Sequence, residues 1–575
     1  MPFPLVLPLS FQRCAPARQD RPFLPLIVLA CVVLVLYVQP RRLDLSGYSR
    51  AAQARDAELA LADLRVASDA PVTSSSLADL ALPRFDKLLA QPILDYDSSV
   101  ALESLRCPKT HLQSNRDQLR NEGEHFWTSV TVAELTSARE RVVERVKSRF
   151  GWGGLDEERL GYEWVEKMLG TGRGLVFTAG KRVTLPLLSC VSPGQLTCQT
   201  PPRSKDTASR LLTSLRILRK HHNCTLPVEF FAFASELSSL GQVKRDIDEL
   251  GGVTWRTSEA ERVEGAWKQF GILLYLDSDN VPLVDPSFLF DSPTYKEHGI
   301  VLWPDFNRDS AANPIWRLLG HPCSPAAAWQ AETGQILVNK RARRGMNLVA
   351  LEVARAMMRE EGFWFRLSGG DKDLFRFAFL FLSLPYSLAP HYPSALGGPM
   401  LARTYKGHLF CGHTMVQYGL DAEREWAHLR STGRLPPRAP HDDDDDNDEA
   451  SKQHAPPLFV HANALKHTGY THRRGSTFIT LKRPLEDRLL GPPSSASRWS
   501  RPAAPLEAIR QAGLPTHGIC IDVWDASARN GAREQVEDAR EGAYEEGGVA
   551  VERWEEAWGG LGRGFEEMYY AQGGV

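Results

Sequence analysis

The stretch from Gly271 to Asn280, GILLYLDSDN, contributes most to the predicted fold and chemistry. Its run Ile272–Leu276 is apolar throughout, which is typical of a strand buried on both faces of a parallel sheet. Two carboxylates, Asp277 and Asp279, follow this strand directly. In extended backbone the side chains at positions i and i+2 point to the same side. We therefore expect the two carboxylates to face one cation.

Carboxylate ligands suit Mn²⁺ or Mg²⁺, and such ions keep open positions for phosphate oxygens. In an enzyme that uses a nucleotide sugar, the ion neutralises the diphosphate leaving group, so no acid has to protonate it. An Asp-x-Asp sequence alone is weakly specific, because roughly one is expected by chance in a chain of this size. The alternative is an Asx turn after a strand. The position after a strand, with Pro282 and Asp285-Pro286 closing the loop, favours the metal site.

Two more apolar runs, Gly174–Thr178 and Val228–Phe233, predict further buried strands. Between them, Ser209–Lys220 has apolar residues on one helical face and basic residues toward its end. This strand–helix–strand order predicts an α/β fold with a parallel sheet. In such folds ligands bind beyond the carboxyl ends of the strands, where Asp277 is expected.

A second candidate for the site is the segment Leu458–Val460, which reads as a strand that ends in His461. The imidazole could complete the metal's ligand set, although a histidine is often an ordinary hydrogen-bonded polar residue. Lys466 follows five residues later and could pair with a phosphate as a point charge.

A third candidate is the segment Leu367–Phe375, LSGGDKDLF, which places Asp371 after a pair of glycines and before a predicted helix, Asp373–Leu382. One interpretation is that Asp371 or Asp373 caps this helix. The other is that Asp371 holds the hydroxyls of a donor sugar.

The N-terminal segment 22–38, PFLPLIVLACVVLVLYV, carries no charge and is long enough to span a thin bilayer. It ends without a small-x-small cleavage site, which favours a signal anchor over a cleaved signal peptide. Arginines lie on both sides of it, so the positive-inside rule does not fix its orientation. The sequon Asn223-Cys224-Thr225 is usable for glycosylation if the C-terminal part is luminal.

The composition is that of a globular protein: 43% of the 575 residues are hydrophobic, 24% are charged and the net charge is -2. No overall field attracts nucleic acid, and the nine cysteines form no CxxC pair, which argues against a structural zinc site. The acidic run 441–449 predicts a solvated loop, with calcium binding as the alternative. The predicted parts are a cytosolic tail 1–21, the anchor 22–38, a stem 39–110, a catalytic domain 111–483 with a disordered acidic insertion 431–457, and a C-terminal extension 484–575.

Several collinear segments resemble the fungal Golgi α-mannosyltransferases of glycosyltransferase family 71, and they cover roughly half of the chain. They are GLVFTAG (Gly174–Gly180), SLRILRKHHNCTLPVEFF (Ser214–Phe231), YLDSDNVPLVDPSFLFDSPTYKEHGIVLWPDF (Tyr275–Phe306), ETGQILVNK (Glu332–Lys340), SGGDKDLFRFAF (Ser368–Phe379) and FVHANALKH (Phe459–His467).

This resemblance implies a GT-A-like, Rossmann-type nucleotide-sugar transferase domain behind an N-terminal transmembrane anchor. It also implies GDP-mannose as donor, Mn²⁺ (or Mg²⁺) as metal, and a mannan or N-glycan of a glycoprotein as acceptor. The expected reaction is a retaining transfer that forms an α-1,2 or α-1,3 linkage. The expected location is the Golgi membrane, as a single-pass type II protein with no nucleic-acid partner.

The resemblance also assigns roles to residues. The metal ligands are Asp277, Asp279 and His461, and the catalytic carboxylate that binds the sugar is Asp371. The residues expected to bind the donor are Thr178, Ala179, Gly180 and Lys466. Trp303 and Asp305 would contact the acceptor, with core packing as the alternative for Trp303.

Two alternatives remain: a transferase of the same fold with another nucleotide sugar, and a catalytically impaired, membrane-anchored glycan-binding protein. The second arises because the segment Arg256–Gln269 is shorter than the corresponding segment of the resembling family. Its fourteen residues are just enough for a crossover between parallel strands. Few of these residues remain to form a wall of the donor pocket. We therefore expect the chain as written to show weak or no mannosyl transfer.

Overall fold

In the computed structural model all described residues belong to one unit, Ala67–Val575. The described residues are 71–103, 112–114, 126–152, 162–178, 207–237, 240–258, 270–308, 310, 312–320, 329–401, 408–434, 454–463, 465, 475, 477–484, 521, 523–525, 544–546 and 549–574. The predicted cytosolic tail and anchor lie outside them. Among these residues, no helix has both the length and the apolar character needed to cross a membrane.

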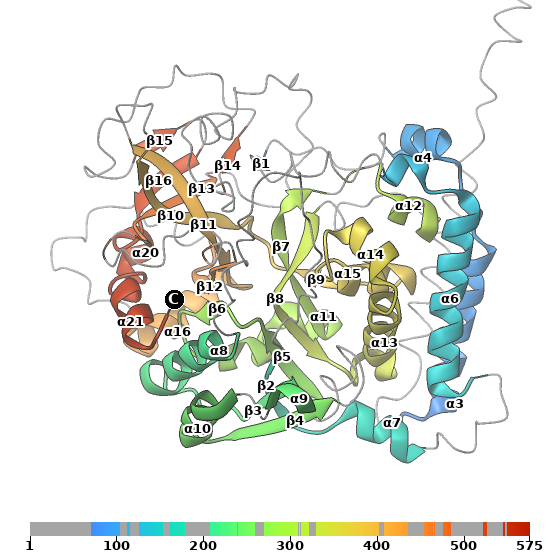
Figure 1. The fold of residues 1–575 in the computed structure, drawn as a ribbon, viewed down its shortest axis with the longest axis horizontal. Helices are drawn as coiled ribbons and strands as arrows, with labels where there is room; N and C mark the ends of the chain where they lie inside the picture. The colour runs from blue at the N-terminus through green and yellow to red at the C-terminus, as the bar shows by residue number, and fades with distance from the viewer. Residues whose placement is uncertain are drawn as a thin grey trace, which may run out of the picture. The chain divides into compact units, whose positions relative to one another are not determined.

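A seven-stranded sheet, which we call the donor sheet, forms the centre of this unit (Figure 1). In spatial order its strands are β4 (Val253–Ser258), β3 (Val228–Phe233), β2 (Arg173–Thr178), β5 (Ile272–Leu276), β8 (Trp329–Asn339), β7 (Ile300–Arg308) and β9 (Ser387–Leu388). The four strands from β4 to β5 are parallel, whereas β8 runs antiparallel to β5 and to β7. The predicted strands β2, β3 and β5 are therefore confirmed, as is the mixed α/β fold.

Both faces of the donor sheet are buried, as the continuous apolar runs predict. Leu175 and Phe177 of β2 join the hydrophobic core on one face, while Val176 joins the core on the other. In β5, Leu274 and Leu273 divide between the same two cores. One core contains residues of the long helices, and the other lies between the donor sheet and a second sheet.

The second sheet, which we call the closing sheet, is antiparallel throughout. Its strands in spatial order are β15 (Tyr544–Glu546), β16 (Val549–Arg553), β13 (Thr480–Pro484), β10 (Ser394–Leu401), β11 (His408–Tyr418), β12 (Pro457–His461) and β6 (Asn280–Pro282). A separate pair joins β1 (Leu112–Ser114) to β14 (Val523–Asp525). The chain passes from β5 in the donor sheet to β6 in the closing sheet through residues 277–279.

Helices flank the two sheets (Figure 1). Those before β5 are α3 (Ser74–Ala90), α4 (Tyr96–Glu103), α6 (Val132–Phe150), α7 (Tyr162–Leu169), α8 (Thr207–Arg216), the π-helical turn η2 (Ile217–His221), α9 (Ala234–Leu237) and α10 (Gly241–Glu249). Those after it are η4 (Pro286–Asp291), α11 (Pro293–His298), α12 (Pro314–Leu319), η6 (Ala342–Gly345), α13 (Met346–Met358), α14 (Glu361–Ser368), α15 (Leu374–Phe381), α16 (Ala422–Ser431), α20 (Ala557–Gly560) and α21 (Phe565–Ala571). The predicted helices at 209–220 and 373–382 are thus present as α8 with η2 and as α15.

Helix α3 lies inside the segment that the sequence analysis placed in a stem. Its N-terminus is closed by Thr73, whose hydroxyl accepts a hydrogen bond from the Ser76 amide at 3.0 Å. Leu77, Ala81 and Phe85 recur at helical spacing and are fully buried. The apolar stripe packs into the same core as α6 and α13, so the folded unit begins well before residue 111.

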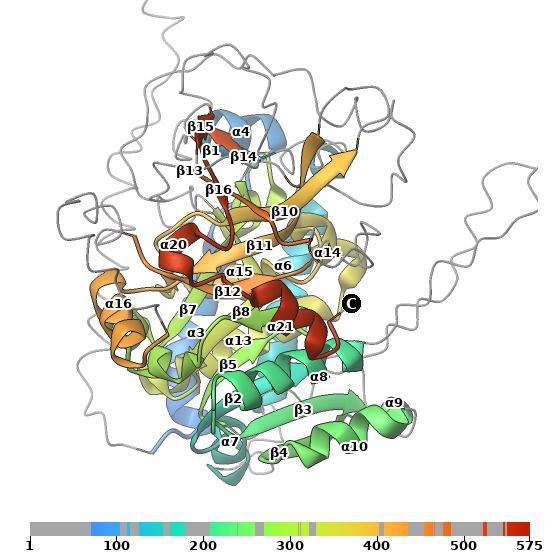
Figure 2. The same ribbon diagram turned by 90° about the vertical axis from the view of Figure 1, so that its left-hand side faces the viewer.

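The C-terminal segment, which the sequence analysis described as an extension, also belongs to the unit. Strand β16 pairs with β13 over five residues, from Val549 to Arg553. Helix α21 lies beside α8 (Figure 2), and the Gln572 carbonyl that follows it accepts a hydrogen bond from Arg216 at 3.2 Å.

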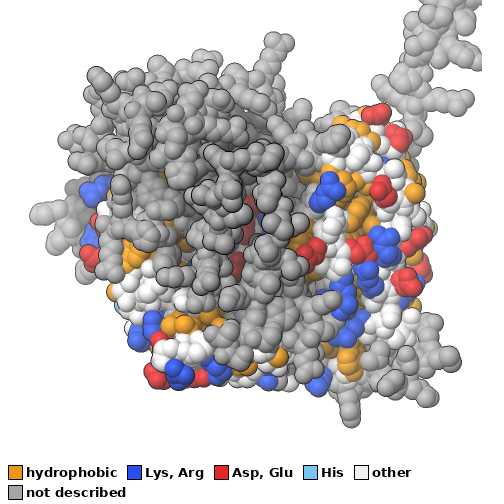
Figure 3. All heavy atoms as spheres, viewed as in Figure 1, with side chains coloured by type: hydrophobic (Ala, Val, Ile, Leu, Met, Phe, Trp, Pro, Cys, Tyr) orange, Lys and Arg blue, Asp and Glu red, His pale blue; other side chains and the backbone are white. Residues whose placement is uncertain are grey.

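The surface over α6 mixes acidic and basic side chains (Figure 3). Arg141 and Arg145 both pair with Glu360, the former at 2.8 Å and the latter at 2.5 Å. Charges of both signs so close together cancel at a distance. This face therefore carries no field of a single sign.

The burial of α3 predicts a large effect for a substitution within it. Phe85 is fully buried, and its ring centroid lies 6.5 Å from Trp152 and 6.3 Å from Phe381. We expect Phe85→Ala to lower the free energy of unfolding by about 3–5 kcal/mol, as measured by denaturant unfolding. The neighbouring Asp86→Ala, whose side chain is exposed, serves as the control. Equal stability of the two variants would show that α3 is not part of the folded unit.

Candidate metal and donor site

The two aspartates of the DSD motif (Asp277-Ser278-Asp279) lie in a tight turn between the two sheets. The Asn280 amide donates a hydrogen bond to the Asp277 carbonyl at 3.1 Å, which is the bond of a β-turn. The Asp277 amide donates to the Gly334 carbonyl of β8 at 2.9 Å. The carboxylates are thus brought together by a turn, and not by the extended backbone that the sequence analysis assumed.

His461 joins them because β12 pairs with β6. In this register His461 lies opposite Asn280, the residue that ends the turn. The imidazole Nε2 is 3.2 Å from Asp279 Oδ1 and 4.0 Å from Asp277 Oδ2. One ligand atom of each of the three residues lies within 4.8 Å of the others. The structure therefore brings the three predicted ligands together.

This arrangement fits a small divalent cation. Ligands at about 2.0–2.2 Å from an octahedral ion lie about 3 Å apart, which is near the spacing of His461 and Asp279. Asp279 and His461 are buried, while the Asp277 side chain is 40% exposed. A ligand could therefore reach the ion from the side of Asp277.

The charges around His461 hold a proton on it in the metal-free protein. Burial lowers the pKa of the imidazole, but the hydrogen bond and charge of Asp279, together with Glu332 and Asp277, outweigh this effect and raise the pKa to about 9. A cation placed among these carboxylates would replace that proton.

Gly334 allows the imidazole to lie directly against β8. A Cβ atom at this position would meet His461 Nδ1 at 2.4 Å and Cε1 at 2.8 Å. The Gly334 carbonyl also accepts a hydrogen bond at 2.6 Å from Nδ2 of the buried Asn280 side chain. The absence of a side chain at Gly334 is thus a condition for the position of His461.

The predicted donor-binding residues begin at the carboxyl end of β2, next to β5. The Thr178 hydroxyl lies 3.2 Å from the Tyr275 hydroxyl. Burial first, and then the negative charges of Asp277, Asp371 and Asp279, raise the pKa of Tyr275 well above its usual value. Thr178 thus reaches the same edge as the DSD turn, as expected for a parallel sheet. Ala179, Gly180 and Lys466 lie outside the described residues.

Asp371 is exposed in the turn that precedes α15. Its negative charge is one of those that raise the pKa of Tyr275 on β5. The neighbouring Asp373 begins α15 without a side-chain cap. Its carboxylate instead accepts from the Ala331 amide at 2.9 Å and pairs with Arg376 at 2.7 Å. Asp373 therefore joins α15 to β8, and helix capping does not describe its role.

The two predicted acceptor residues are both buried. Trp303 is fully buried, donates from Nε1 to the Tyr418 carbonyl at 2.8 Å, and packs edge-on against Phe459. Trp303 therefore packs in the core, which was the alternative to contact with the acceptor. Asp305 forms an ion pair with Lys372 and accepts from the Phe306 amide at 2.7 Å.

Sequence reasoning missed Glu332, Gly334, Tyr275 and Lys372. Glu332 and Lys372 each lie in a segment of family resemblance, and Glu332 interrupts an otherwise neutral strand. A charged residue in a strand buried on both faces is itself a signal. It could have singled out Glu332.

Part of the chain that contains candidate site residues matches known proteins. Residues 267–317 and 325–419 match the model of a family described as "Mannosyltransferase putative". The predicted resemblance to mannosyltransferases is confirmed. The matching residues include Asp277, Asp279, Glu332 and Asp371.

Two relatives from Candida albicans are similar over short segments. "Alpha-1,2-mannosyltransferase MNN22" is 40% identical over 70 residues, and "Alpha-1,2-mannosyltransferase MNN2" is 51% identical over 37 residues. The matched segments span 12% and 6% of this chain and the same shares of the two relatives. The predicted class, a glycosyltransferase, is borne out over this part of the chain.

Two solved structures of glycosyltransferases show a weak likeness. The apo form of glycosyltransferase GlyE from Streptococcus pneumoniae TIGR4 is 12% identical with a TM-score of 0.23, over 38% of this chain and 45% of that one. Mouse xyloside xylosyltransferase 1 is 13% identical with a TM-score of 0.24, over 38% of this chain and 83% of that one. A likeness of this extent adds nothing to the argument about fold or activity.

The contact between Gly334 and His461 predicts the effect of one added methyl group. We expect Gly334→Ala to displace the imidazole and to weaken Mn²⁺ binding about tenfold or more, measured by titration calorimetry. Gly362→Ala is the matched control, because no atom lies within 4 Å of the added Cβ there. If Gly334→Ala binds Mn²⁺ as tightly as this control, His461 does not lie against β8 as described.

Proposed function

We propose that this protein is a metal-dependent, retaining α-mannosyltransferase that transfers mannose from GDP-mannose to mannose-containing glycans of glycoproteins. The observation that carries the proposal is the cluster of Asp277, Asp279 and His461 at the carboxyl edge of a parallel sheet. Two of these residues lie in the part of the chain that matches the mannosyltransferase family. We further propose that the donor sheet and its DSD turn form a GT-A-type domain.

The ligand set favours Mn²⁺ over Mg²⁺. Two carboxylates suit either ion, but an imidazole is a softer ligand that Mg²⁺ rarely takes. When bound, such an ion neutralises the negative charge that develops on a diphosphate leaving group. Asp277 and Asp279 would hold it from the turn, and His461 from the opposite strand.

The remaining groups at this edge bind and orient the substrates. Thr178 offers a hydroxyl at the end of β2, where a nucleotide would lie. Asp371 is exposed and carries a negative charge, so it is suited to accept hydrogen bonds from sugar hydroxyls. Both Candida relatives are named α-1,2-mannosyltransferases, which favours an α-1,2 linkage over α-1,3.

We also propose that the protein is a single-pass type II protein of the Golgi membrane, with this unit in the lumen. The uncharged segment 22–38 supports an anchor. Cys411 is buried and disulfide-bonded, which fits an oxidising compartment. Asn223 is exposed and follows the η2 turn, so its side chain is accessible to a glycosyltransferase.

Substitution of the metal ligands tests the proposed activity. We expect the chain with Mn²⁺ to transfer mannose from GDP-mannose in a screen of nucleotide sugars, at a low rate because the segment Arg256–Gln269 is short. Asp277→Asn and Asp279→Asn should each lower this rate about 100-fold or more, because a lost ligand weakens charge stabilisation at the leaving group. Asp291→Asn, a half-exposed surface aspartate of the same segment, should keep the wild-type rate. Full activity in excess EDTA, or use of another donor only, would contradict the proposal.

The pKa of His461 predicts how metal binding depends on pH. The neutral imidazole is the ligand, so below a pKa of about 9 Mn²⁺ has to displace a proton. We expect the dissociation constant to rise as the pH falls from 9 to 6.5, by up to about tenfold per pH unit. Calorimetry in buffers with different ionisation enthalpies counts the released protons. His461→Ala should lose this slope, and a pH-independent wild type would contradict the proposed ligand.

The luminal location predicts a glycan on Asn223. We expect the full-length protein expressed in a fungal host to shift in gel mobility after treatment with an endoglycosidase. Asn223→Gln should abolish the shift, whereas Asn313→Gln should not, since Asn313 is buried at the start of α12. Absence of a glycan on the wild type would contradict a luminal position.

A further inference from the structure

The far side of the His461 imidazole carries a polar atom with no partner. Nδ1 is buried and forms no hydrogen bond to any described residue. Glu332 Oε1 lies 3.8 Å from it, beyond hydrogen-bonding distance in the metal-free protein. Nε2, on the other side of the ring, faces Asp279 and Asp277. The ring therefore stands between Glu332 and the two carboxylates of the metal cluster.

Metal binding through Nε2 determines which hydrogen-bonding group stands on the Nδ1 side of the ring. A neutral imidazole has one N–H group, so a ring that binds an ion through Nε2 must carry its proton on Nδ1. A buried N–H group without an acceptor is unfavourable, because it has lost its hydrogen bond to water. Glu332 is the acidic side chain on this side of the ring.

Glu332 is held in place by its own strand. It lies on β8 two residues before Gly334, where the register of β8 against β7 shifts. The glycine allows the ring to approach, and the carboxylate then lies beside it. Glu332 Oε1 also accepts a hydrogen bond from the Thr333 amide at 3.1 Å.

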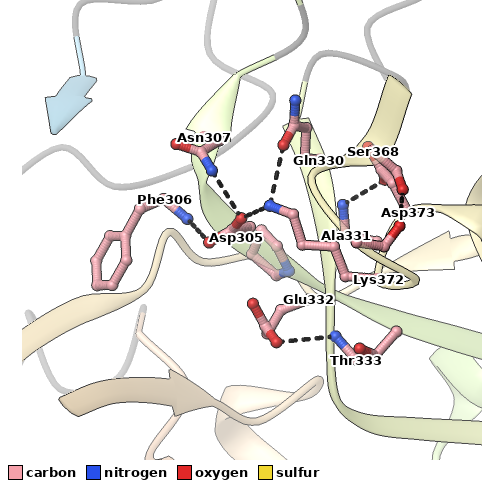
Figure 4. A network of polar contacts seen from close by, with 12 residues as sticks. Asp305, Phe306, Asn307, Gln330, Ala331, Glu332, Thr333, Ser368, Lys372 and Asp373 are labelled. Atoms are coloured by element: carbon pink, nitrogen blue, oxygen red, sulfur yellow. Dashed lines mark hydrogen bonds and ion pairs between the residues drawn. The ribbon is translucent and has the colours of Figure 1, made fainter. Parts of the chain in front are cut away.

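A buried lysine binds side chains of β7 and β8 near Glu332. Lys372 enters from the loop before α15, pairs with Asp305 on β7, and donates to Gln330 at 3.0 Å (Figure 4). Burial lowers the pKa of Lys372, but the charges of Asp305 and Glu332 outweigh this and raise it, so the ammonium group stays charged.

We infer that Glu332 is a positioning residue of the metal centre, whose carboxylate accepts the Nδ1–H of His461 and thereby turns Nε2 toward the ion. The inference rests on the metal site of the proposed function. It adds a residue that touches neither the ion nor the sugar.

The test is Mn²⁺ binding to the full chain without any sugar donor. Glu332→Met removes the acceptor and its charge and keeps a similar volume. We expect it to weaken Mn²⁺ binding 10- to 100-fold and to reduce the ¹⁴N hyperfine coupling of bound Mn²⁺ in electron–nuclear double resonance. Glu332→Asp keeps the charge but sets the carboxylate back by one methylene group, so it should lose less affinity and retain the nitrogen coupling.

The matched control is Glu229→Met, a buried glutamate of the same sheet that pairs with Arg256 at 3.0 Å. It should lower the melting temperature but leave Mn²⁺ affinity within about twofold of wild type. Wild-type affinity and nitrogen coupling in Glu332→Met would overturn the inference. If that variant does not fold, an affinity in Glu332→Asp equal to that of the wild type would overturn it equally. A wild type that binds no Mn²⁺ would instead refute the metal site itself.

Discussion

The turn at residues 277–280 is the constraint on which the rest of the site depends. In this turn the chain leaves the mixed donor sheet and enters the antiparallel closing sheet, so its side chains lie where the two sheets meet. The carboxylates come from the turn, the imidazole from the partner strand β12, and the glycine beneath it from β8. Backbone pairing sets all three, so the geometry of the cluster is fixed before any ligand arrives.

The sequence predicted the parts that depend on local pattern. Ile272–Leu276 was recognisable because a strand buried on both faces has no polar residue to interrupt it, and β2 and β3 were found in the same way. His461 was found because it ends such a strand. The proximity of Asp277, Asp279 and His461 was therefore predictable. The two carboxylates, however, meet in a turn and not through the alternation of side chains along an extended strand.

The parts that sequence missed depend on long-range packing. Nothing local to Glu332 tells that His461, 129 positions away, will lie beside it (461 − 332). Trp303 was assigned to the acceptor site because tryptophan often stacks on sugars, but its neighbours in space are Phe459 and Tyr418. The boundary of the folded unit was misplaced because α3 carries its apolar stripe among small residues, which lowers the contrast with a linker.

The pairing of β16 with β13 has a consequence for how the protein is made. The closing sheet needs Val549–Arg553, near the end of the 575 residues, to complete its edge, whereas the donor sheet needs only residues up to Leu388. Since domains fold as the chain emerges from the ribosome, the donor sheet can form while the closing sheet still lacks its last strands. During that interval β13 presents an unpaired edge, which is prone to wrong association. A chain terminated early would keep that edge open and become a natural client of the chaperones that monitor nascent proteins.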